Sequence, residues 1–293
     1  MQSRYRSAGY TSSMPALLPA VSVVIPCLND APALAACLAS LAAQTVRPFE
    51  IVVVDNNSTD NSAAVASGFG ARVVFEPVPG IPAAAAAGYD AARGQIIARC
   101  DADCVLPEDW IARIAESFAA DPTLAALSGP GRFYGFPRPL GALLSVLYLG
   151  SYYLAMGLAL GHLPLFGSNL ALRTSVWHQV RGKVHREDPE QHDDVCLSLH
   201  LGQEYRCRFE PTLVVGMAPR AVIGGANLVR RFRRAFHTLW AHWPGEAPWV
   251  RWPRRFTQPR ETAPREAAPR KSRAAGPTAS GDTAGAAAAP ATD

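Results

Sequence analysis

Two carboxylates separated by one residue stand where an apolar run ends, in residues 95–110, which read QIIARCDADCVLPEDW. In an extended segment, the side chains of Asp101 and Asp103 project to the same side. Hard carboxylate oxygens suit Mg²⁺ or Mn²⁺ that already holds a diphosphate. We therefore interpret the pair as a candidate metal site. The alternative is an Asx-rich turn that caps a helix starting near Pro107.

The elements that must position this pair alternate between two patterns. Short β-branched or apolar runs predict buried strands at residues 21–25, 50–54, 71–75 and 95–98. Helical spacing of apolar residues follows at 32–44 and again at 81–93. This βα repeat predicts an α/β fold with a mostly parallel sheet covered by helices on both faces. Ligands of such sheets bind at the carboxyl ends of the strands, where Asp55, Asp101 and Asp103 all fall.

Length and composition limit the class of protein. A chain of 293 residues with 49% hydrophobic residues can bury a full core, so we expect one large domain with appendages. The net charge of +4 is mild, and its basic excess is local, because arginines recur densely from Arg220 onward. No nucleic-acid reading module is recognisable, so we expect no nucleic-acid partner.

The cysteines and the N-terminus bear on compartment. The six cysteines form no Cys-x-x-Cys pair and have no His-rich partner in sequence, so we expect no zinc site and interpret them as small core residues in a reducing cytosol. The N-terminus lacks an apolar run long enough for a signal sequence. These features predict a cytoplasmic protein.

Two common nucleotide-binding motifs do not occur. No Gly-x-Gly-x-x-Gly follows the first predicted strand, and no Gly-x-x-x-x-Gly-Lys-Ser/Thr appears anywhere. These observations argue against a dinucleotide-binding Rossmann protein and against a P-loop enzyme. The remaining possibility is a protein that holds a nucleotide through acidic side chains and a metal ion.

The motifs VSVVIPCLND, CLASLAAQT, EIVVVDNNSTDNS, DADCVLPEDW, GSNLALR and HDDVCLSLHL, within residues 21–215, resemble in order and spacing the family 2 glycosyltransferases of the GT-A fold. The resemblance implies inverting transfer of a sugar from a nucleotide diphosphate sugar to a hydroxyl of a glycan or lipid-linked acceptor, with Mn²⁺ or Mg²⁺. It also implies five site residues: Pro26 and Asn29 in the nucleotide pocket, Asp55 on the base, Asp101 near the ribose and Asp103 on the metal. The alternative for Asp55 is a turn acid that serves only as a helix cap.

Inversion at the anomeric carbon requires a carboxylate that takes the proton of the acceptor hydroxyl. The run that starts at Asp193 resembles the family's Glu-Asp followed by an apolar helix, with Asp193 where Glu is usual. We therefore assign Asp194 as the base, with Asp193 as the next candidate. The competing interpretation is an acidic cap on the helix N-terminus.

The segment GSNLALR resembles the family's stretch at the acceptor side of the donor pocket. Gly167 and Ser168 are small enough to permit close backbone approach, and Asn169 could bond a sugar hydroxyl or organise the loop. We assign these three residues and Asp193 to the sugar site. The alternative is ordinary turn chemistry.

Departures from the family pattern narrow the prediction. The processive synthases' Gln-x-x-Arg-Trp is missing after Asp194, which favours single addition over polymerisation. The competing class is a non-catalytic nucleotide-sugar-binding or membrane-scaffold protein of the same fold, against which Asp55, Asp103 and Asp194 argue. A nucleotidyltransferase is disfavoured because its glycine-rich, lysine-bearing N-terminal loop is absent.

Residues 140–160 carry no charge and are long enough, as a helix, to cross a bilayer of about 30 Å. A simple crossing would put Asp103 and Asp194 on opposite sides of the membrane, in conflict with the proposed chemistry. A re-entrant hairpin broken near Gly150 and Ser151, an interfacial helix, a homodimer contact and a buried core helix remain. We favour an interfacial or self-associating helix.

The C-terminal third departs from the family resemblance. Residues 228–243 mix arginines with aromatic residues, as in a basic amphipathic helix at the inner face of a membrane; the alternative is a helix that packs back on the catalytic domain. From residue 257 the chain lacks large apolar residues, which predicts disorder. The predicted organisation is a flexible N-terminus (1–19), a catalytic domain (20–219), a basic helical appendage (220–256) and a disordered tail (257–293).

Overall fold

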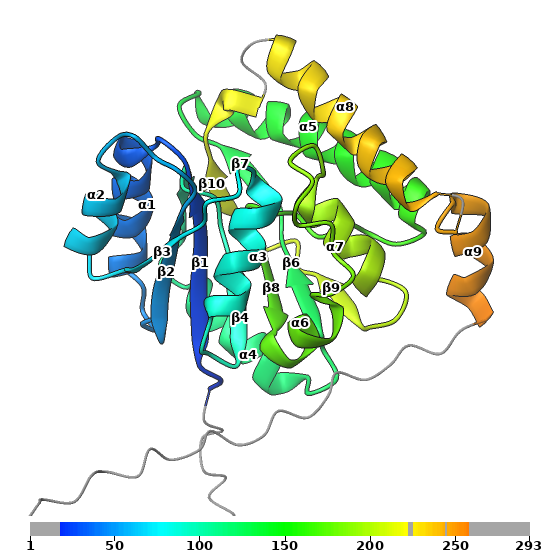
Figure 1. The fold of residues 1–293 in the computed structure, drawn as a ribbon, viewed down its shortest axis with the longest axis horizontal. Helices are drawn as coiled ribbons and strands as arrows, with labels where there is room; N and C mark the ends of the chain where they lie inside the picture. Colours follow the sequence, from blue (N-terminus) through cyan, green and yellow to red (C-terminus); the bar gives the residue numbers. More distant parts are fainter. Residues whose placement is uncertain (1–17, 222–224, 244, 258–293) are drawn as a thin grey trace, which may run out of the picture.

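The computed structural model describes residues 18–221, 225–243 and 245–257 (Figure 1). Nearly all of the expected flexible N-terminus and disordered tail lies outside these described residues. The strands are β1 (Val21–Cys27), β2 (Glu50–Asp55), β3 (Arg72–Phe75), β4 (Ile96–Arg99), β5 (Cys104–Val105), β6 (Ala126–Ser128), β7 (Gly131–Phe133), β8 (Leu170–Arg173), β9 (Cys207–Phe209) and β10 (Val215–Met217).

The helices are α1 (Ala31–Ala42), α2 (Ser62–Gly68), α3 (Ile81–Ala91), α4 (Trp110–Ala120), α5 (Arg138–Leu160), α6 (Thr174–Val180), α7 (Asp193–Leu201), α8 (Gly225–His242) and α9 (Pro248–Thr257), with a 3₁₀ turn, η1, at Pro219–Ala221. The four strands predicted from the N-terminal third all form, with ends shifted by at most two residues. Their β-branched runs are typical of strands buried on both faces.

The main sheet has the strand order β3-β2-β1-β4-β8-β6-β9. Strand β1 pairs in parallel with β2 and β4, and β2 pairs in parallel with β3. Strand β8 runs antiparallel to both of its neighbours, β4 and β6. The predicted mostly parallel sheet is therefore confirmed, with one strand reversed near its middle.

Alternate residues of β1 enter two separate cores, as the two-residue period of a strand requires. Val23 and Ile25 pack with α1, α2 and α4 on one face, while Val24 packs with α3, α6 and α7 on the other. Helix α3 can lie close to the sheet because of Gly88, where a Cβ would come within 2.3 Å of Val24 Cγ1 and 2.8 Å of Val54 Cγ2. Helices thus cover both faces of the sheet (Figure 1).

A smaller sheet, β5-β10-β7, carries α5. The helix is continuous through Gly150 and Ser151, so the re-entrant hairpin predicted as one alternative does not form. Its buried residues follow one stripe, Gly141, Ser145, Leu149, Met156 and Leu160. The remaining faces are largely exposed, which also excludes a plain core helix in this chain. Among the described residues, α5 is the one helix long and apolar enough to cross a membrane.

The C-terminal appendage consists of two helices, α8 and α9, where the sequence argument expected one. Helix α9 is anchored by Arg251, which is fully buried. Its guanidinium donates to the carbonyl oxygens of Leu160 at 2.8 Å and Leu199 at 3.2 Å, and it pairs with Glu246. A basic residue therefore holds α9 against the ends of α5 and α7.

Candidate active site

The predicted site residues of the N-terminal half gather at one edge of the main sheet. Strands β1, β2 and β4 are parallel neighbours, so their carboxyl ends meet there. Asn29 follows β1, Asp55 ends β2, and Asp101 and Asp103 follow β4. The alignment of these ends confirms the placement expected from the βα repeat.

The loops after β1 and β2 are tied together by short polar side chains. Asn29 Oδ1 accepts the backbone N–H of Thr59 at 2.7 Å and that of Asp60 at 3.2 Å. Asn29 has φ +52° and Asn57 has φ +65°, a backbone region that asparagine tolerates better than most residues. These turns leave the half-exposed Pro26 and Asp55 at the sheet edge.

Asp55 forms a local turn through one carboxylate oxygen. Its Oδ1 accepts the backbone N–H of Ser58 at 2.9 Å. A carboxylate has about four lone-pair positions, so Asp55 keeps capacity for a further donor. The structure thus contains the turn interaction named as the alternative role and still leaves Asp55 able to bind a ligand.

Both oxygens of Asp101 are engaged by protein groups. Oδ1 lies 3.1 Å from Nη2 of Arg99, and Oδ2 accepts the Ser168 hydroxyl at 2.5 Å. The Asp101 side chain remains 39% exposed. Asp101 therefore joins the turn after β4 to the segment before β8 and still presents a face to solvent.

Asp103 is the more buried acid of the pair. Burial first, and then the charge of Asp101, raises the pKa of Asp103 to about 6, while Arg220 opposes the rise. Arg220, on η1, places Nε 3.4 Å from Asp103 Oδ2 and Nη2 2.7 Å from Asp30 Oδ2. A basic side chain thus reaches the predicted metal ligand from the C-terminal third, which the sequence motifs did not indicate.

Arg99 connects the two acidic segments of the site, and the sequence argument missed this role. It is 2% exposed, and its guanidinium pairs with Asp101 after β4 and with Asp193 at the start of α7. A Cβ on Gly167 would come within 2.8 Å of Arg99 Nη1, so glycine is required for this close approach. An arginine at the end of a buried strand, next to acids, is the signal that could have found it.

Helix α7 begins with the acids predicted to supply the base. Asp194 Oδ2 accepts the backbone N–H of Gly167 at 2.9 Å, and its Oδ1 lies 3.1 Å from His192 Nδ1. Although burial opposes ionisation, His192, Arg99 and this amide outweigh it and lower the pKa of Asp194 to about 2. Asp193 and Asp194 stand in the first turn of α7, where the helix dipole favours an acid, but α7 has no side-chain cap hydrogen bond at its N-cap residue, His192. One lone-pair position of Asp194 Oδ2 remains for a ligand.

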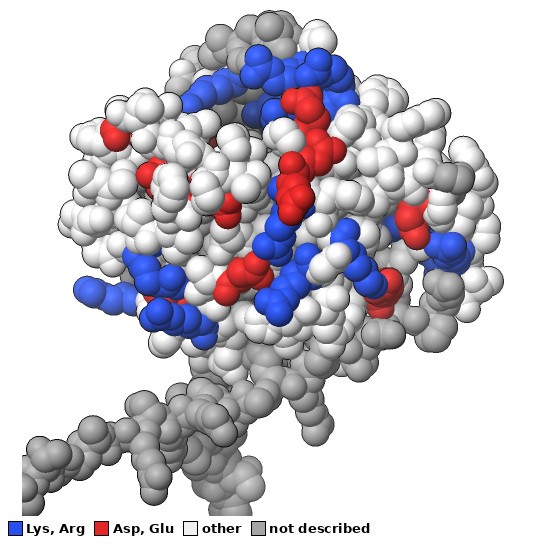
Figure 2. All heavy atoms as spheres, in the orientation of Figure 1, with Lys and Arg blue, Asp and Glu red and all other residues white. Residues whose placement is uncertain are grey.

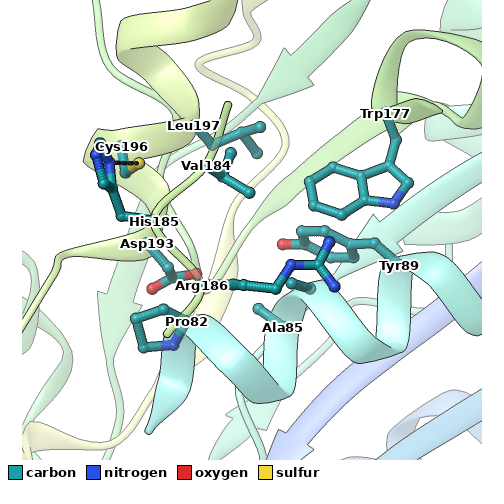
Figure 3. Close-up of a pocket in the computed structure, with 11 residues that line it drawn as sticks. Pro82, Ala85, Tyr89, Trp177, Val184, His185, Arg186, Asp193, Cys196 and Leu197 are labelled. Atoms are coloured by element: carbon teal, nitrogen blue, oxygen red, sulfur yellow. Dashed lines mark hydrogen bonds between the residues drawn. The ribbon is translucent and has the colours of Figure 1, made fainter. Parts of the chain in front are cut away.

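Asp193 differs from Asp194 in its environment. Burial outweighs the attraction of Arg99, and the adjacent charge of Asp194 adds to it, so the pKa of Asp193 is raised. Its side chain also lines a cavity of about 20 Å³ beneath α7, bounded by Pro82, Tyr89 and Trp177 (Figure 3). That volume suits one water molecule and excludes a sugar.

The Gly167-Ser168-Asn169 segment is tightly held, and of the two roles predicted for Asn169 the structure supports the second, organising the loop, and not the sugar contact. Asn169 is fully buried; its amide donates to the carbonyl oxygens of Pro130 and Leu213, and its Oδ1 accepts Trp110 Nε1–H at 2.9 Å. With donors and acceptor used inside the protein, Asn169 organises the loop and does not bond a sugar hydroxyl. Gly167 and Ser168 act through their bonds to Asp194 and Asp101.

The donor set at this edge suits a hard divalent cation. Asp101 and Asp103 supply carboxylate oxygens, and oxygen donors of this kind suit Mg²⁺ and Mn²⁺. The neighbouring Cys100 and Cys104 side chains are fully buried in the core. The buried Asp103 carboxyl, opposed by a like charge, would be stabilised as an anion by such a cation. These residues fit a metal bound to a diphosphate.

Solved structures and curated proteins resemble this chain. A mannosyltransferase from Pyrobaculum calidifontis, in complex with GDP-Man and Mn²⁺, superposes with a TM-score of 0.62 at 22% identity, over 82% of this chain and 68% of that one. An uncharacterized glycosyltransferase of Mycobacterium tuberculosis is 50% identical over 84 residues, 29% of this chain and 37% of the relative. A PGL/p-HBAD biosynthesis glycosyltransferase of the same species is 39% identical over 104 residues, 33% of this chain and 41% of the relative.

The matched segment thus spans well under half the length of these two relatives. The family model described as "Glycosyl transferase family 2" matches residues 22–172, just over half of the chain. That segment contains β1 to β4, the turn with Asp101 and Asp103, and the Gly167-Ser168-Asn169 loop. The fold, the strand-end acids and this match together establish that the chain belongs to glycosyl transferase family 2 and has the GT-A architecture.

Proposed function

We propose that the protein is an inverting glycosyltransferase that moves a sugar from a nucleotide diphosphate sugar to an acceptor hydroxyl, once per acceptor, with Mn²⁺ or Mg²⁺. The proposal rests on one observation: the Arg99 guanidinium pairs both with Asp101, after β4, and with Asp193, at the start of α7. Donor-binding and acceptor-activating groups must act on one sugar, so they need a rigid connection of this kind. Membership of a glycosyltransferase family supports the same activity.

The donor side of the proposal uses the sheet edge. Pro26, Asn29 and Asp55 would bind the nucleoside, with Asp55 on the base and Asp101 toward the ribose. Asp103 would hold the metal, which supplies charge stabilisation for the departing diphosphate. Arg220 already faces Asp103 and Asp30, so we assign it a second cationic contact to the diphosphate.

The acceptor side uses the acids of α7. Asp194 would take the proton of the acceptor hydroxyl through the open position of Oδ2, with His192 and the Gly167 amide fixing its orientation. Its low pKa keeps Asp194 ionised at neutral pH but makes it a weak base. Asp193 is the stronger base of the two, because its pKa is raised, and remains the second candidate.

Enzyme assays separate these roles. We expect the wild-type protein to release nucleoside diphosphate from one member of a panel of nucleotide sugars when Mn²⁺ and an acceptor extract are present. Asp103→Ala should abolish Mn²⁺-dependent thermal stabilisation by nucleoside diphosphate, and Asp194→Asn should lower turnover on the order of 10²-fold or more with donor binding kept. Asp109→Asn, an exposed acid outside the site, is the matched control.

The outcomes decide between the two classes of protein. Donor binding without diphosphate release in the wild type would support the non-catalytic binding protein instead. Near-normal turnover of Asp194→Asn with loss of turnover in Asp193→Asn would move the base to Asp193. Equal ligand-induced shifts in wild type and Asp103→Ala would reject the metal assignment.

The acceptor is proposed to be a glycan or lipid-linked molecule at a membrane surface. Apolar side chains are exposed on three neighbouring helices: Leu143, Val146, Leu147 and Leu154 on α5, Phe232, Phe236 and Trp240 on α8, and Trp249 and Phe256 on α9. Helix α5 contacts both of the others: Arg231 of α8 donates to the Tyr148 hydroxyl, and Trp252 of α9 donates to the Leu158 carbonyl. An exposed apolar surface of this extent marks an interaction site.

Basic residues of α8 favour an anionic bilayer as the occupant. Lys and Arg side chains gather along α8 at the top of Figure 2. Arg233 and Arg234 are paired with Glu190, whereas Arg230 and Arg231 are exposed and form no ion pair with an acid among the described residues. We therefore assign Arg230 and Arg231 to lipid headgroups, on the cytoplasmic face of the membrane.

Vesicle flotation tests this assignment. Arg230→Gln/Arg231→Gln should weaken binding to anionic liposomes by about 30-fold, since each arginine contributes roughly 1 kcal/mol near the surface. Arg181→Gln/Arg206→Gln, two exposed arginines outside these helices, should bind as wild type does. A protein that stays soluble with anionic vesicles at low salt and elutes as a dimer would favour the homodimer contact through residues 140–160.

A further inference from the structure

Four potential metal ligands converge behind the acids of α7. Cys196 and His200 lie one turn apart on α7, His185 lies in the loop before this helix, and His242 ends α8. One ligand atom from each residue lies within 4.8 Å of the other three. The group, which we call the Cys-His cluster, was not expected from the sequence, because its members are scattered over 58 positions from His185 to His242.

The spacing inside the Cys-His cluster agrees with tetrahedral coordination. Cys196 Sγ lies 3.7 Å from His185 Nδ1 and 3.7 Å from His242 Nε2, and His185 and Cys196 face one another in Figure 3. Zinc–sulfur and zinc–nitrogen bonds of about 2.3 and 2.05 Å at the tetrahedral angle imply a sulfur–nitrogen separation of about 3.6 Å. A metal fits between these atoms with little movement.

The hydrogen bond of His242 prepares its ring for a metal. Nδ1 lies 2.7 Å from the carbonyl oxygen of Thr238. A carbonyl can only accept, so Nδ1 carries the proton and Nε2 directs its lone pair at Cys196. Metal-ligating histidines commonly donate their other N–H to a carbonyl in this way, which fixes the tautomer.

Hydrogen bonding alone does not account for the cluster. The Cys196 thiol is a weak donor and its sulfur a weak acceptor, so its contacts with the two imidazole nitrogens at 3.7 Å are weak as hydrogen bonds. His200 Nε2 is buried and has no hydrogen-bond partner among the described residues. A buried polar atom without a partner is costly, and a metal ion would satisfy it.

We propose that the Cys-His cluster binds one Zn²⁺ ion that fastens α8 to α7. One thiolate and three imidazoles match the borderline-soft character of zinc, and four protein ligands leave no open position, which is typical of a structural site. Cys196 lies three residues beyond Asp193 on α7, so the ion would stabilise the helix that carries the proposed base. It shares no ligand with the oxygen site at Asp103.

Metal content provides the first test. Full-length protein freed of metal should take up one equivalent of Zn²⁺, gain thermal stability, and show the absorption of a tetrahedral thiolate complex with Co²⁺. His185→Gln, His242→Gln and Cys196→Ser should each lose this binding, whereas His178→Gln, Cys207→Ser and Asp103→Ala should keep it. His185 is exposed, so its variant should fold even if Cys196→Ser does not.

Limited proteolysis tests the fastening of α8. Zn²⁺ should slow cleavage between α7 and α8 in the wild type and in His178→Gln, and should not slow it in His185→Gln or His242→Gln. Wild-type protein without stoichiometric zinc, or cluster variants that retain it, would overturn the site. Stoichiometric zinc with unchanged cleavage would overturn its role in holding α8.

Discussion

Removal of Arg99 should reveal how strongly the two acidic segments are coupled. Arg99 is 2% exposed, and the Asp193 side chain is 15% exposed, so Arg99→Met breaks a buried ion pair. Loss of one partner of such a pair costs about 3–5 kcal/mol, because the other charge stays buried. Asp101 is 39% exposed, so its pair with Arg99 should contribute at most about 1 kcal/mol.

A double-mutant cycle separates the coupling energy between Arg99 and Asp193 from the cost of losing either residue alone. We expect Arg99→Met and Asp193→Leu each to destabilise the protein strongly, and the double variant to be more stable than the sum predicts by about 2 kcal/mol or more, since neither charge is then left alone. Asp101→Asn should cost at most about 1 kcal/mol. The exposed pair Lys183 and Glu204, at 3.2 Å, provides the control cycle, with a coupling below about 1 kcal/mol.

Urea unfolding of the full chain, followed by circular dichroism and tryptophan fluorescence, measures each free energy. Arg99 lowers the pKa of Asp193 against the larger effect of burial, so Arg99→Met should raise that pKa further. A carboxyl whose folded-state pKa is raised destabilises the fold above that pKa, and the penalty is relieved as pH falls through it. The cost of Arg99→Met should therefore shrink toward acid pH. Additivity within about 0.5 kcal/mol would refute the coupling.

Three further predictions concern the same site. Gly167→Ala should lower the melting temperature and turnover, because the new Cβ meets Arg99 Nη1 at 2.8 Å, whereas Gly182→Ala, with nothing within 4 Å, should change neither. Because the pKa of Asp194 is lowered from 3.8 to about 2, its charge contributes about 2 kcal/mol of stability at neutral pH, lost as pH falls from about 4 to about 2; unfolding of Asp194→Asn should lack this dependence. Asn169→Ala should cost about 2 kcal/mol or more in urea unfolding, since the buried Trp110 indole N–H and the Leu213 carbonyl oxygen lose their partner, whereas the Pro130 carbonyl keeps the Val215 N–H.

Local patterns in the sequence determined the sheet and its edge. The run from Val21 to Ile25 predicts a buried strand, which the structure extends to Cys27, and parallel strands of this kind bring their carboxyl ends together. The sequence alone therefore predicted that Asp55, Asp101 and Asp103 lie at the carboxyl edge of the main sheet, without knowledge of any tertiary contact. The order of the family motifs was likewise sufficient for the family, which the match to residues 22–172 confirms.

Only the tertiary structure decided which side chains meet. Arg99 pairs with Asp193, 94 positions later, and Asn169 accepts a hydrogen bond from the indole of Trp110, 59 positions earlier. Neither partner can be recognised from a local sequence pattern. The one-sided burial of α5 and the convergence of the Cys-His cluster have the same origin. Hydrophobic periodicity reports the face that each element buries, whereas the partner on that face depends on how distant elements pack.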